Sequence, residues 1–265
     1  MPRRRRYEAS SWPRLLRSRD LTWDGCLNVR DLGGLPTRDG GETRSGAVVR
    51  ADSVHGLSGE GWQALVDHGI RSVVDLRGDH EREDDPPAEL PVQVVHVPFM
   101  EASEEEWEEI AEELEAANAT ADDVAATRDA YLIFLERFKP NVRRAFGAVA
   151  RAPEGGVVVH CVGGKDRTGL LSAFLLDLAG VAEEDIAADY ALSEERLRSR
   201  HEGWFAAAET DEERERLRRI AQCPADAMAG VLAELRRRYG GVEGYLRSAG
   251  VSDEELELAR ARLRA

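Results

Sequence analysis

Residues 156–180 constrain the fold of this chain most strongly, because they join two apolar runs through a short polar loop. The run 156–161, GVVVHC, is β-branched and apolar on consecutive positions, which is typical of a strand covered on both faces. The run 168–180, TGLLSAFLLDLAG, is typical of a buried helix that ends at Gly180. In such a strand–loop–helix unit, loop N–H groups and the positive end of the helix dipole converge on one point. The segment therefore predicts an anion cradle that suits a phosphate.

Strands and helices alternate along most of the chain. Short β-branched runs recur in three further places, 46–50, 72–77 and 92–99. Apolar residues follow helical spacing at 58–68 and 121–151, and every segment from residue 182 onward has a helical pattern. The alternation predicts an α/β fold with a mostly parallel central sheet flanked by helices, and with a helical C-terminal layer.

Length and charge limit the organisation of the chain. Its 265 residues suffice for one large domain, and three scattered cysteines are too few for a disulfide framework or a structural zinc site. Residues 1–20 carry seven arginines against two acidic residues, whereas the whole chain has a net charge of −15. We therefore expect a basic, disordered tail over 1–20 and a single acidic domain over 21–265, which argues against nucleic-acid binding. No apolar run is long enough for a membrane helix or a secretory signal, so we expect no transmembrane segment and a cytoplasmic location.

The loop between the two apolar runs carries residue types that serve nucleophilic catalysis. Cys161 lies at the predicted strand end, facing the cradle, where the helix dipole and Arg167 favour its thiolate form. Arg167 follows six positions later, so its planar guanidinium can fold back and bind two phosphate oxygens. Thr168 is expected to donate a hydrogen bond to the sulfur, which makes the thiolate a better leaving group. The backbone of the loop completes the predicted phosphate site, which comprises Val162, Gly163, Gly164 and Lys165.

The spacing Cys-x5-Arg-Thr resembles the signature loop of the cysteine-dependent protein-tyrosine phosphatases. The longer stretch HCVGGKDRTG (160–169) is similar to the bacterial branch with the loop His-Cys-x-x-Gly-Lys-Asp-Arg, which covers tyrosine, dual-specificity and phosphoinositide phosphatases. Three further stretches resemble that branch, NVRDLGG (28–34), VVDLR (73–77) and YGGVEGYL (239–246). A Walker-type nucleotide loop is not supported, because Lys165 is followed by Asp rather than by Ser or Thr.

The resemblance implies a protein-tyrosine-phosphatase-like fold and a phosphomonoester hydrolase that acts through a cysteinyl-phosphate intermediate. It implies no cofactor and no metal, and the substrate would be a phosphorylated protein or a small phosphoester. We expect Asn28, Arg30 and Asp31 to buttress the loop, and His160 to orient the Cys161 region. Two other functions are weighed against this one. The first is an inactive phosphate-recognising binding module of the same fold. The second is a cysteine-based sulfurtransferase or arsenate reductase, which would require sulfur-donor handling or further redox cysteines close to the loop.

The general acid is an open choice between two aspartates. Many tyrosine phosphatases resemble one another in a Trp-Pro-Asp loop, and this sequence has no such tripeptide. Asp166 lies one residue from Arg167 and could protonate the leaving oxygen, or it could merely stabilise the first helical turn. Asp75 lies at the end of a predicted parallel strand, where it could act as the acid or pair with and orient Arg167. The acidic run 79–85 that follows has metal-ligand residue types but is interpreted as an exposed loop.

Two features bear on the substrate class and point in opposite directions. Lys165 is one of only two lysines, and it resembles the extra cation with which phosphoinositide phosphatases bind a multiply phosphorylated head group. Residues 101–123 carry eleven acidic residues and no basic one. As a lid over the site this helix would repel anionic bilayers, and the alternative is a solvated surface helix. Its predicted apolar face comprises Trp107, Ile110, Ala111 and Leu114.

Overall fold

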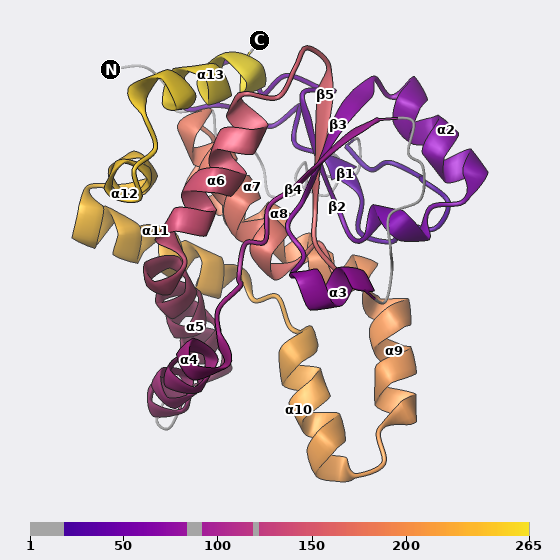
Figure 1. The fold of residues 1–265 in the computed structure, drawn as a ribbon, viewed down its shortest axis with the longest axis vertical. Coiled ribbons are helices and arrows are strands. Elements are labelled where there is room, and N and C mark those ends of the chain that lie inside the picture. Colours follow the sequence, from indigo (N-terminus) through magenta and orange to yellow (C-terminus); the bar gives the residue numbers. More distant parts are fainter. Residues whose placement is uncertain (1–18, 84–91, 119–121, 265) are drawn as a thin grey trace.

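The computed structural model describes residues 19–83, 92–118 and 122–264 and arranges them around a five-stranded sheet (Figure 1). The strand order is β1-β2-β5-β3-β4. Only the short edge pair β1–β2 is antiparallel, and the other pairs are parallel, so the predicted mostly parallel sheet is confirmed. The strands are β1 (Arg30–Asp31), β2 (Val48–Ala51), β3 (Ile70–Asp75), β4 (Gln93–His96) and β5 (Gly156–His160).

β5 occupies the centre of the sheet and is buried along its whole length. Its consecutive valines pack on both faces, as expected for a strand covered by helices on both sides. Parallel pairing brings the carboxyl ends of three strands together, because His160 lies beside Ala51 of β2 and Asp75 of β3. Open α/β sheets build their sites at this edge. The segment that follows β5 is the predicted cradle.

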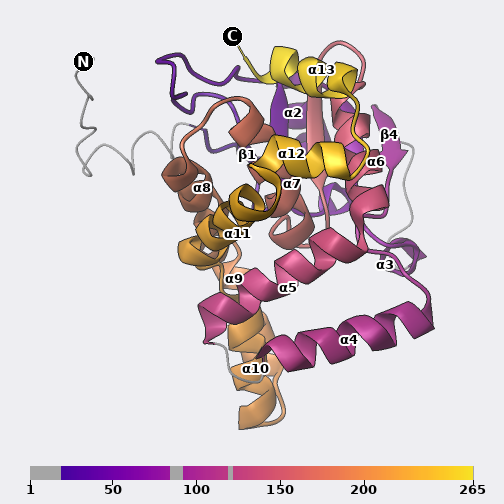
Figure 2. The ribbon, with the colours of Figure 1, turned by 90° about the vertical axis from the view of Figure 1, so that its left-hand side faces the viewer.

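Helices cover the two faces of the sheet unequally (Figures 1 and 2). One face packs against α2 through a smaller core that includes Trp23, Leu65 and Val73. The other face packs against the helices after β4 and the C-terminal helices, which confirms the predicted helical layer. The helices are η1 (Val54–Gly56), α2 (Gly59–Asp67), α3 (Asp79–Glu83), α4 (Glu104–Asn118), α5 (Asp123–Arg137), α6 (Lys139–Ala150), α7 (Asp166–Leu178), α8 (Glu183–Arg196), α9 (Arg198–Ala207), α10 (Asp211–Ala221), α11 (Ala225–Tyr239), α12 (Val242–Ser248) and α13 (Asp253–Leu263).

Helix ends follow local chemistry, with one departure from the expected pattern. α7 ends before Gly180, whose φ of 90° lets the N–H of Val181 return to the carbonyl of Leu176 at 3.0 Å. The helix expected over 121–151 is two helices that break at Phe138. Pro140 explains the break, since it has no N–H to continue α5 but is tolerated in the first turn of α6.

The acidic helix α4 lies along α5 (Figure 2). Ile110 is buried, and Glu109 and Glu113 pair with Arg137 of α5. The expected apolar face is only partly correct, because Trp107 remains 36% exposed. Of the two alternatives, the structure favours a surface helix that packs on α5.

α9 and α10 form an antiparallel pair that projects beyond the edge where the strands end (Figures 1 and 2). Within the described ranges, no helix combines the length and the apolar character that crossing a bilayer requires. Residues 1–18 of the expected tail lie outside the described residues. Arg19 and Asp20 do not fit that expectation, because Arg19 is 4% exposed and donates a hydrogen bond to the carbonyl of Asp31 at 2.6 Å, and Asp20 pairs with Arg196.

A buried cluster of one acid and three arginines connects this N-terminal segment to the cradle. Asp189 of α8 pairs with Arg19 at 2.8 Å, Arg30 at 3.1 Å and Arg50 at 2.7 Å. Burial raises the pKa of Asp189, but the three positive charges outweigh burial and hold that pKa well below its ordinary value. Arg50 also donates to the carbonyl of Gly164 at 2.8 Å, so the cluster supports the loop directly.

The substitution Asp189→Asn will lower the free energy of unfolding by about 3–5 kcal/mol, because it leaves buried guanidinium groups without a counter-charge. Urea denaturation at neutral pH measures this. The control is Asp177→Asn, whose partner Arg38 is half exposed, and it will cost no more than about 1 kcal/mol. Folding lowers the pKa of Asp189. The stability that its charge contributes is therefore complete at pH values above the pKa of the unfolded state, about 3.9, and is lost as the pH falls through the pKa of the folded state. Equal losses for the two variants would contradict this account.

Candidate active site

The loop after β5 is held by its carbonyl groups. The side-chain amide of Asn28 donates to the carbonyls of Gly163 at 3.0 Å and Gly164 at 3.2 Å, and Arg50 donates to Gly164 as well. The backbone N–H groups of residues 162–168 donate no hydrogen bond to any group in the described part of the chain. α7 begins at Asp166 without a side-chain cap, so its positive end is also available. This arrangement of donors is what an anion cradle requires.

Gly164 is a position of the loop at which no residue other than glycine fits. Its φ is 64°, and a Cβ at this position would lie 2.3 Å from the carbonyl oxygen of Ala51. A Cβ on Gly163 would have ordinary room, with its nearest neighbour, a guanidinium nitrogen of Arg200, at 3.6 Å. The close approach of the loop to the end of β2 therefore depends on Gly164.

Cys161 lies at the start of the loop and is 2% exposed. Burial lowers the pKa of Arg167, but the neighbouring Cys161 sulfur and the Glu81 carboxylate outweigh burial and raise that pKa above its ordinary value. Thr168 is fully buried, and its hydroxyl has no hydrogen-bond partner among the described residues. The expected hydrogen bond from Thr168 to the sulfur is therefore not formed in this structure.

Glu81 of α3 is the residue that the sequence analysis missed. Its carboxylate accepts hydrogen bonds from both terminal nitrogens of Arg167, one of them at 2.8 Å. It also accepts a hydrogen bond from the backbone N–H of Gly78 at 2.7 Å. The acidic run 79–85 was expected to be an exposed loop, but residues 79–83 form α3, and residues 84 and 85 lie outside the described residues. Glu81 holds the guanidinium of Arg167 in place.

Lys165 and Asp166 contact two helices beside the loop. Lys165 donates to the carbonyl of Ile220 in α10 at 2.8 Å and lies 3.0 Å from Asp166. The ammonium thus donates to protein carbonyls in the absence of substrate, and its expected role in binding substrate phosphate stays a prediction. Tyr131 of α5 donates to Asp166 at 2.5 Å, and the Asp166 side chain is 42% exposed. Burial raises the pKa of Asp166, but Lys165, Tyr131 and Arg167 together lower it below its ordinary value.

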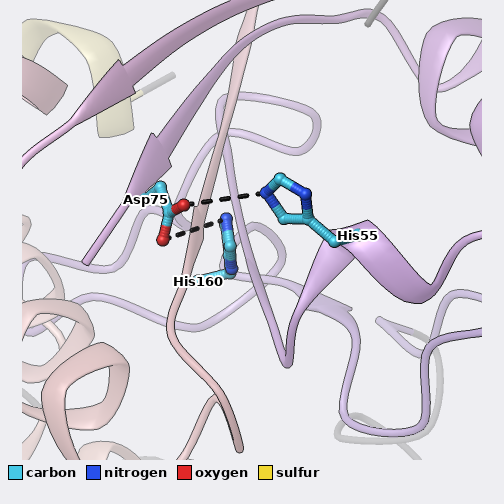
Figure 3. Close-up of side chains that lie close together, drawn as sticks. All are labelled: His55, Asp75 and His160. Carbon is cyan, nitrogen blue, oxygen red and sulfur yellow. Dashed lines mark ion pairs between the residues drawn. The ribbon is translucent and has the colours of Figure 1, made fainter. Parts of the chain in front are cut away.

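Asp75 and His160 lie at the strand ends beneath the loop, with His55 of η1 beside them (Figure 3). Asp75 is fully buried and is held by Arg77, with Nη2 at 2.9 Å and Nε at 3.0 Å from the carboxylate. Asp75 therefore pairs with Arg77 and does not orient Arg167. The Nδ1 of His160 donates to the carbonyl of Cys161 at 3.2 Å, and burial lowers the pKa of His160 to about 4.

The three polar residues of the stretch 28–34 separate into two groups. Asn28 contacts the loop, and Arg30 donates to the side-chain oxygen of Asn28 at 2.6 Å. The side chain of Asp31 does not contact Asn28 or Arg30. Its carboxylate instead accepts the backbone N–H groups of Gly33 and Gly46, each at 2.7 Å, and so fixes the turn that precedes β2.

Comparisons with known proteins agree with this geometry. A tyrosine-protein phosphatase of Nostoc commune is 35% identical over 147 residues, which cover 51% of this chain and 48% of that protein. A relative in Cupriavidus necator is 32% identical over 181 residues, covering 67% of this chain and 64% of its own length. The triple specificity protein phosphatase PtpB of Mycobacterium tuberculosis is 28% identical over 272 residues, covering 89% and 96%. The chain thus spans about half to two thirds of the first two relatives and nearly all of the third.

The model of one protein family covers almost the whole described chain. This model, described as the tyrosine phosphatase family, matches residues 21–265. The match includes the cradle, the strands around it and the helices that support it. The chain belongs to the tyrosine phosphatase family.

Proposed function

We propose that this protein is a metal-independent, cysteine-dependent phosphomonoester hydrolase. One observation carries the proposal. A buried cysteine begins a loop whose N–H groups have no partner among the described residues, and the same loop supplies an arginine held by a carboxylate. Such a loop offers a nucleophile, a bidentate clamp and a set of fixed donors for one phosphoryl group.

In the first chemical step, the Cys161 sulfur attacks phosphorus while the bond to the leaving oxygen breaks. The leaving oxygen takes a proton from Asp166. Arg167 and the loop N–H groups bind the three remaining oxygens, whose charge develops in the transition state. In the second step water attacks phosphorus, Asp166 accepts its proton, and the sulfur–phosphorus bond breaks to return the thiolate. The unpaired hydroxyl of Thr168 is available to donate to the departing sulfur.

Asp166 suits the role of acid better than Asp75. The Asp166 side chain reaches solvent at the rim of the cradle, whereas Asp75 is fully buried and bound by Arg77. The lowered pKa of Asp166 makes it a carboxylate in the free enzyme at neutral pH. A bound phosphate dianion beside it raises that pKa, because two like charges close together disfavour ionisation of the acid.

The substitution Asp166→Asn will have effects that depend on the leaving group. Turnover of a phosphoserine peptide, which has a poor leaving group, will fall by about 10²-fold or more, because an alkoxide needs a proton as it departs. For p-nitrophenyl phosphate, kcat/KM, which reports the steps up to release of the leaving group, will fall by less than about tenfold, since nitrophenolate leaves without a proton. Steady-state kinetics on both substrates measures the difference. Equal losses on the two substrates would remove Asp166 from the role of acid.

The proposed substrates are phosphotyrosine proteins first, with phosphoserine, phosphothreonine and phosphoinositides as further classes. The relative from Mycobacterium tuberculosis is named for triple specificity, which supports more than one class. The test is phosphate release with EDTA present from a phosphotyrosine peptide, a phosphoserine peptide and a soluble phosphoinositide. We expect turnover in EDTA, fastest on phosphotyrosine. No turnover on any of them, with binding of phosphate retained, would instead assign the fold to a phosphate-binding module. A cytoplasmic location fits a nucleophile that must stay a free thiol.

A further inference from the structure

Two histidines and one aspartate converge beneath the signature loop (Figure 3). His55 comes from η1, Asp75 ends β3 and His160 ends β5. Their ligand atoms lie within 4.8 Å of one another. The Nε2 of His55 is 3.7 Å from one oxygen of Asp75, and the Nε2 of His160 is 3.5 Å from the other. The three side chains are at most 2% exposed.

The cluster contains two buried nitrogens without a hydrogen-bond partner among the described residues, the Nε2 atoms of His55 and His160. For His160 the tautomer is fixed, because Nδ1 must carry the hydrogen that it donates to the carbonyl of Cys161. In the neutral ring, Nε2 then presents a lone pair to a carboxylate oxygen. Two acceptors that face each other in a buried site are unfavourable, and either a proton or a metal ion between them removes the repulsion.

The donor set and its supports match those of a zinc site. Imidazole nitrogen and carboxylate oxygen are both ligands of Zn²⁺, at distances of about 2.0–2.2 Å, so that neighbouring ligand atoms in a tetrahedral site lie roughly 3.4 Å apart. The observed separations of 3.5 and 3.7 Å are to different oxygens of Asp75, so they suit a carboxylate that binds through both oxygens, and the three ligand atoms lie within 4.8 Å of one another. Histidine ligands commonly donate their other N–H to a backbone carbonyl, as His160 does, and ligating carboxylates are themselves hydrogen-bonded, as Asp75 is by Arg77.

We propose that His55, Asp75 and His160 form a binding site for a divalent transition-metal ion of the Zn²⁺ type. Arg77 contacts Asp75, and Arg82 lies 3.6 Å from the same carboxylate. These positive charges weaken binding, so the ion is a reversible, regulatory ligand and not a structural one. Bound metal draws Nε2 of His160 toward Asp75 and thereby shifts the backbone of Cys161, to which His160 is bonded. Metal binding therefore inhibits, a consequence that rests on the proposed function, whereas binding itself does not.

Calorimetric titration of Zn²⁺ into the metal-free full chain tests the site. Wild type and Cys161→Ser will each bind one ion at the cluster, while His55→Ala and His55→Gln will bind it at least about tenfold more weakly. The matched control is His68→Ala, which removes a histidine that pairs with Asp31 at 3.1 Å outside the cluster, and it will bind as wild type does. Circular dichroism and thermal unfolding without metal establish that each variant is folded. Loss of binding in Cys161→Ser with retention in both His55 variants would overturn the proposal, because the thiolate would then be the ligand.

Co²⁺ provides a spectroscopic test that does not depend on turnover. Co²⁺ bound at the cluster will give visible ligand-field bands without the near-ultraviolet charge-transfer band of a thiolate ligand. For inhibition, His55→Gln will retain wild-type turnover in EDTA but will need at least about tenfold more Zn²⁺ for half inhibition. A thiolate charge-transfer band, or the same inhibition in His55→Gln as in wild type, would overturn the cluster. Absence of turnover in all proteins would instead count against the proposed function and leave the binding result standing.

Discussion

Replacing Cys161 with serine will lower the rate of phosphate release by a factor on the order of 10⁵ or more, since loss of a catalytic nucleophile removes the covalent route. A serine hydroxyl is not ionised at neutral pH and is a far weaker nucleophile than a cysteine sulfur. Serine is nearly isosteric with cysteine, so the fold and the binding of phosphate will be kept. The measurement is single-turnover phosphate release, with binding of inorganic phosphate recorded in parallel.

Cys26→Ser is the matched control for this substitution. The thiol of Cys26 donates to the carbonyl of Ser53 at 3.5 Å, and a serine hydroxyl can make the same hydrogen bond. Burial and the neighbouring Asp52 raise the pKa of Cys26, so it remains a thiol and takes no part in the reaction. The rate of turnover by Cys26→Ser will stay within about twofold of the wild-type rate, because a change away from the cradle alters no group that touches the phosphate. Residual turnover above about one per cent in Cys161→Ser would be incompatible with Cys161 as the nucleophile.

Replacing Arg167 with lysine will lower kcat/KM by about 10³-fold or more, as expected for a residue that stabilises charge on a phosphoryl group. Lysine retains the charge, but an ammonium cannot bind two phosphate oxygens in parallel and cannot keep both contacts to Glu81. Most of the loss will be in kcat, because the clamp acts most strongly on the transition state. Steady-state kinetics with a phosphotyrosine peptide separates the two parameters.

Glu81→Gln is the companion to that substitution. The amide can still accept the N–H of Gly78 and one N–H of Arg167, so the guanidinium keeps its charge but loses part of its orientation. We expect a loss of about tenfold, intermediate between wild type and Arg167→Lys, and a positioning role predicts additional loss of less than about threefold when both residues are changed. Full additivity of the two effects would show that Glu81 acts independently of Arg167.

The central unit of the fold could be predicted because its signals are local. The consecutive valines before Cys161, the glycine-bearing loop and the apolar helix after it lie within one short stretch, and the structure places β5 and α7 there. Asn28 was recognised through its own motif, and it contacts the loop as expected. In each case, the residues that define the element or the contact are marked by type and spacing.

The contacts that the sequence could not show join residues far apart in the chain. Glu81 and Arg167 are 86 positions apart, and Asp189 is 139 positions from Arg50. Each acid lies in a stretch rich in other charged residues, where the sequence alone does not distinguish a buried carboxylate from a solvated one. Asp75 illustrates the opposite error, because its place at a strand end was recognised but its partner, Arg77, lies two residues away and not in the signature loop. Partner choice between charges depends on tertiary packing that neither periodicity nor motif records.

Trapping the phosphoenzyme tests the central claim most directly. Wild type mixed with excess p-nitrophenyl phosphate and quenched in acid within the first turnover will carry one phosphoryl group, on the peptide that contains Cys161. Asp166→Asn will accumulate more of it if water attack is slowed more than formation, and Cys161→Ser will carry none. A burst of nitrophenol equal to the enzyme concentration will accompany the labelling where hydrolysis of the intermediate is rate-limiting. Turnover without a phosphoryl group on Cys161, or with the group on another residue, would contradict the account.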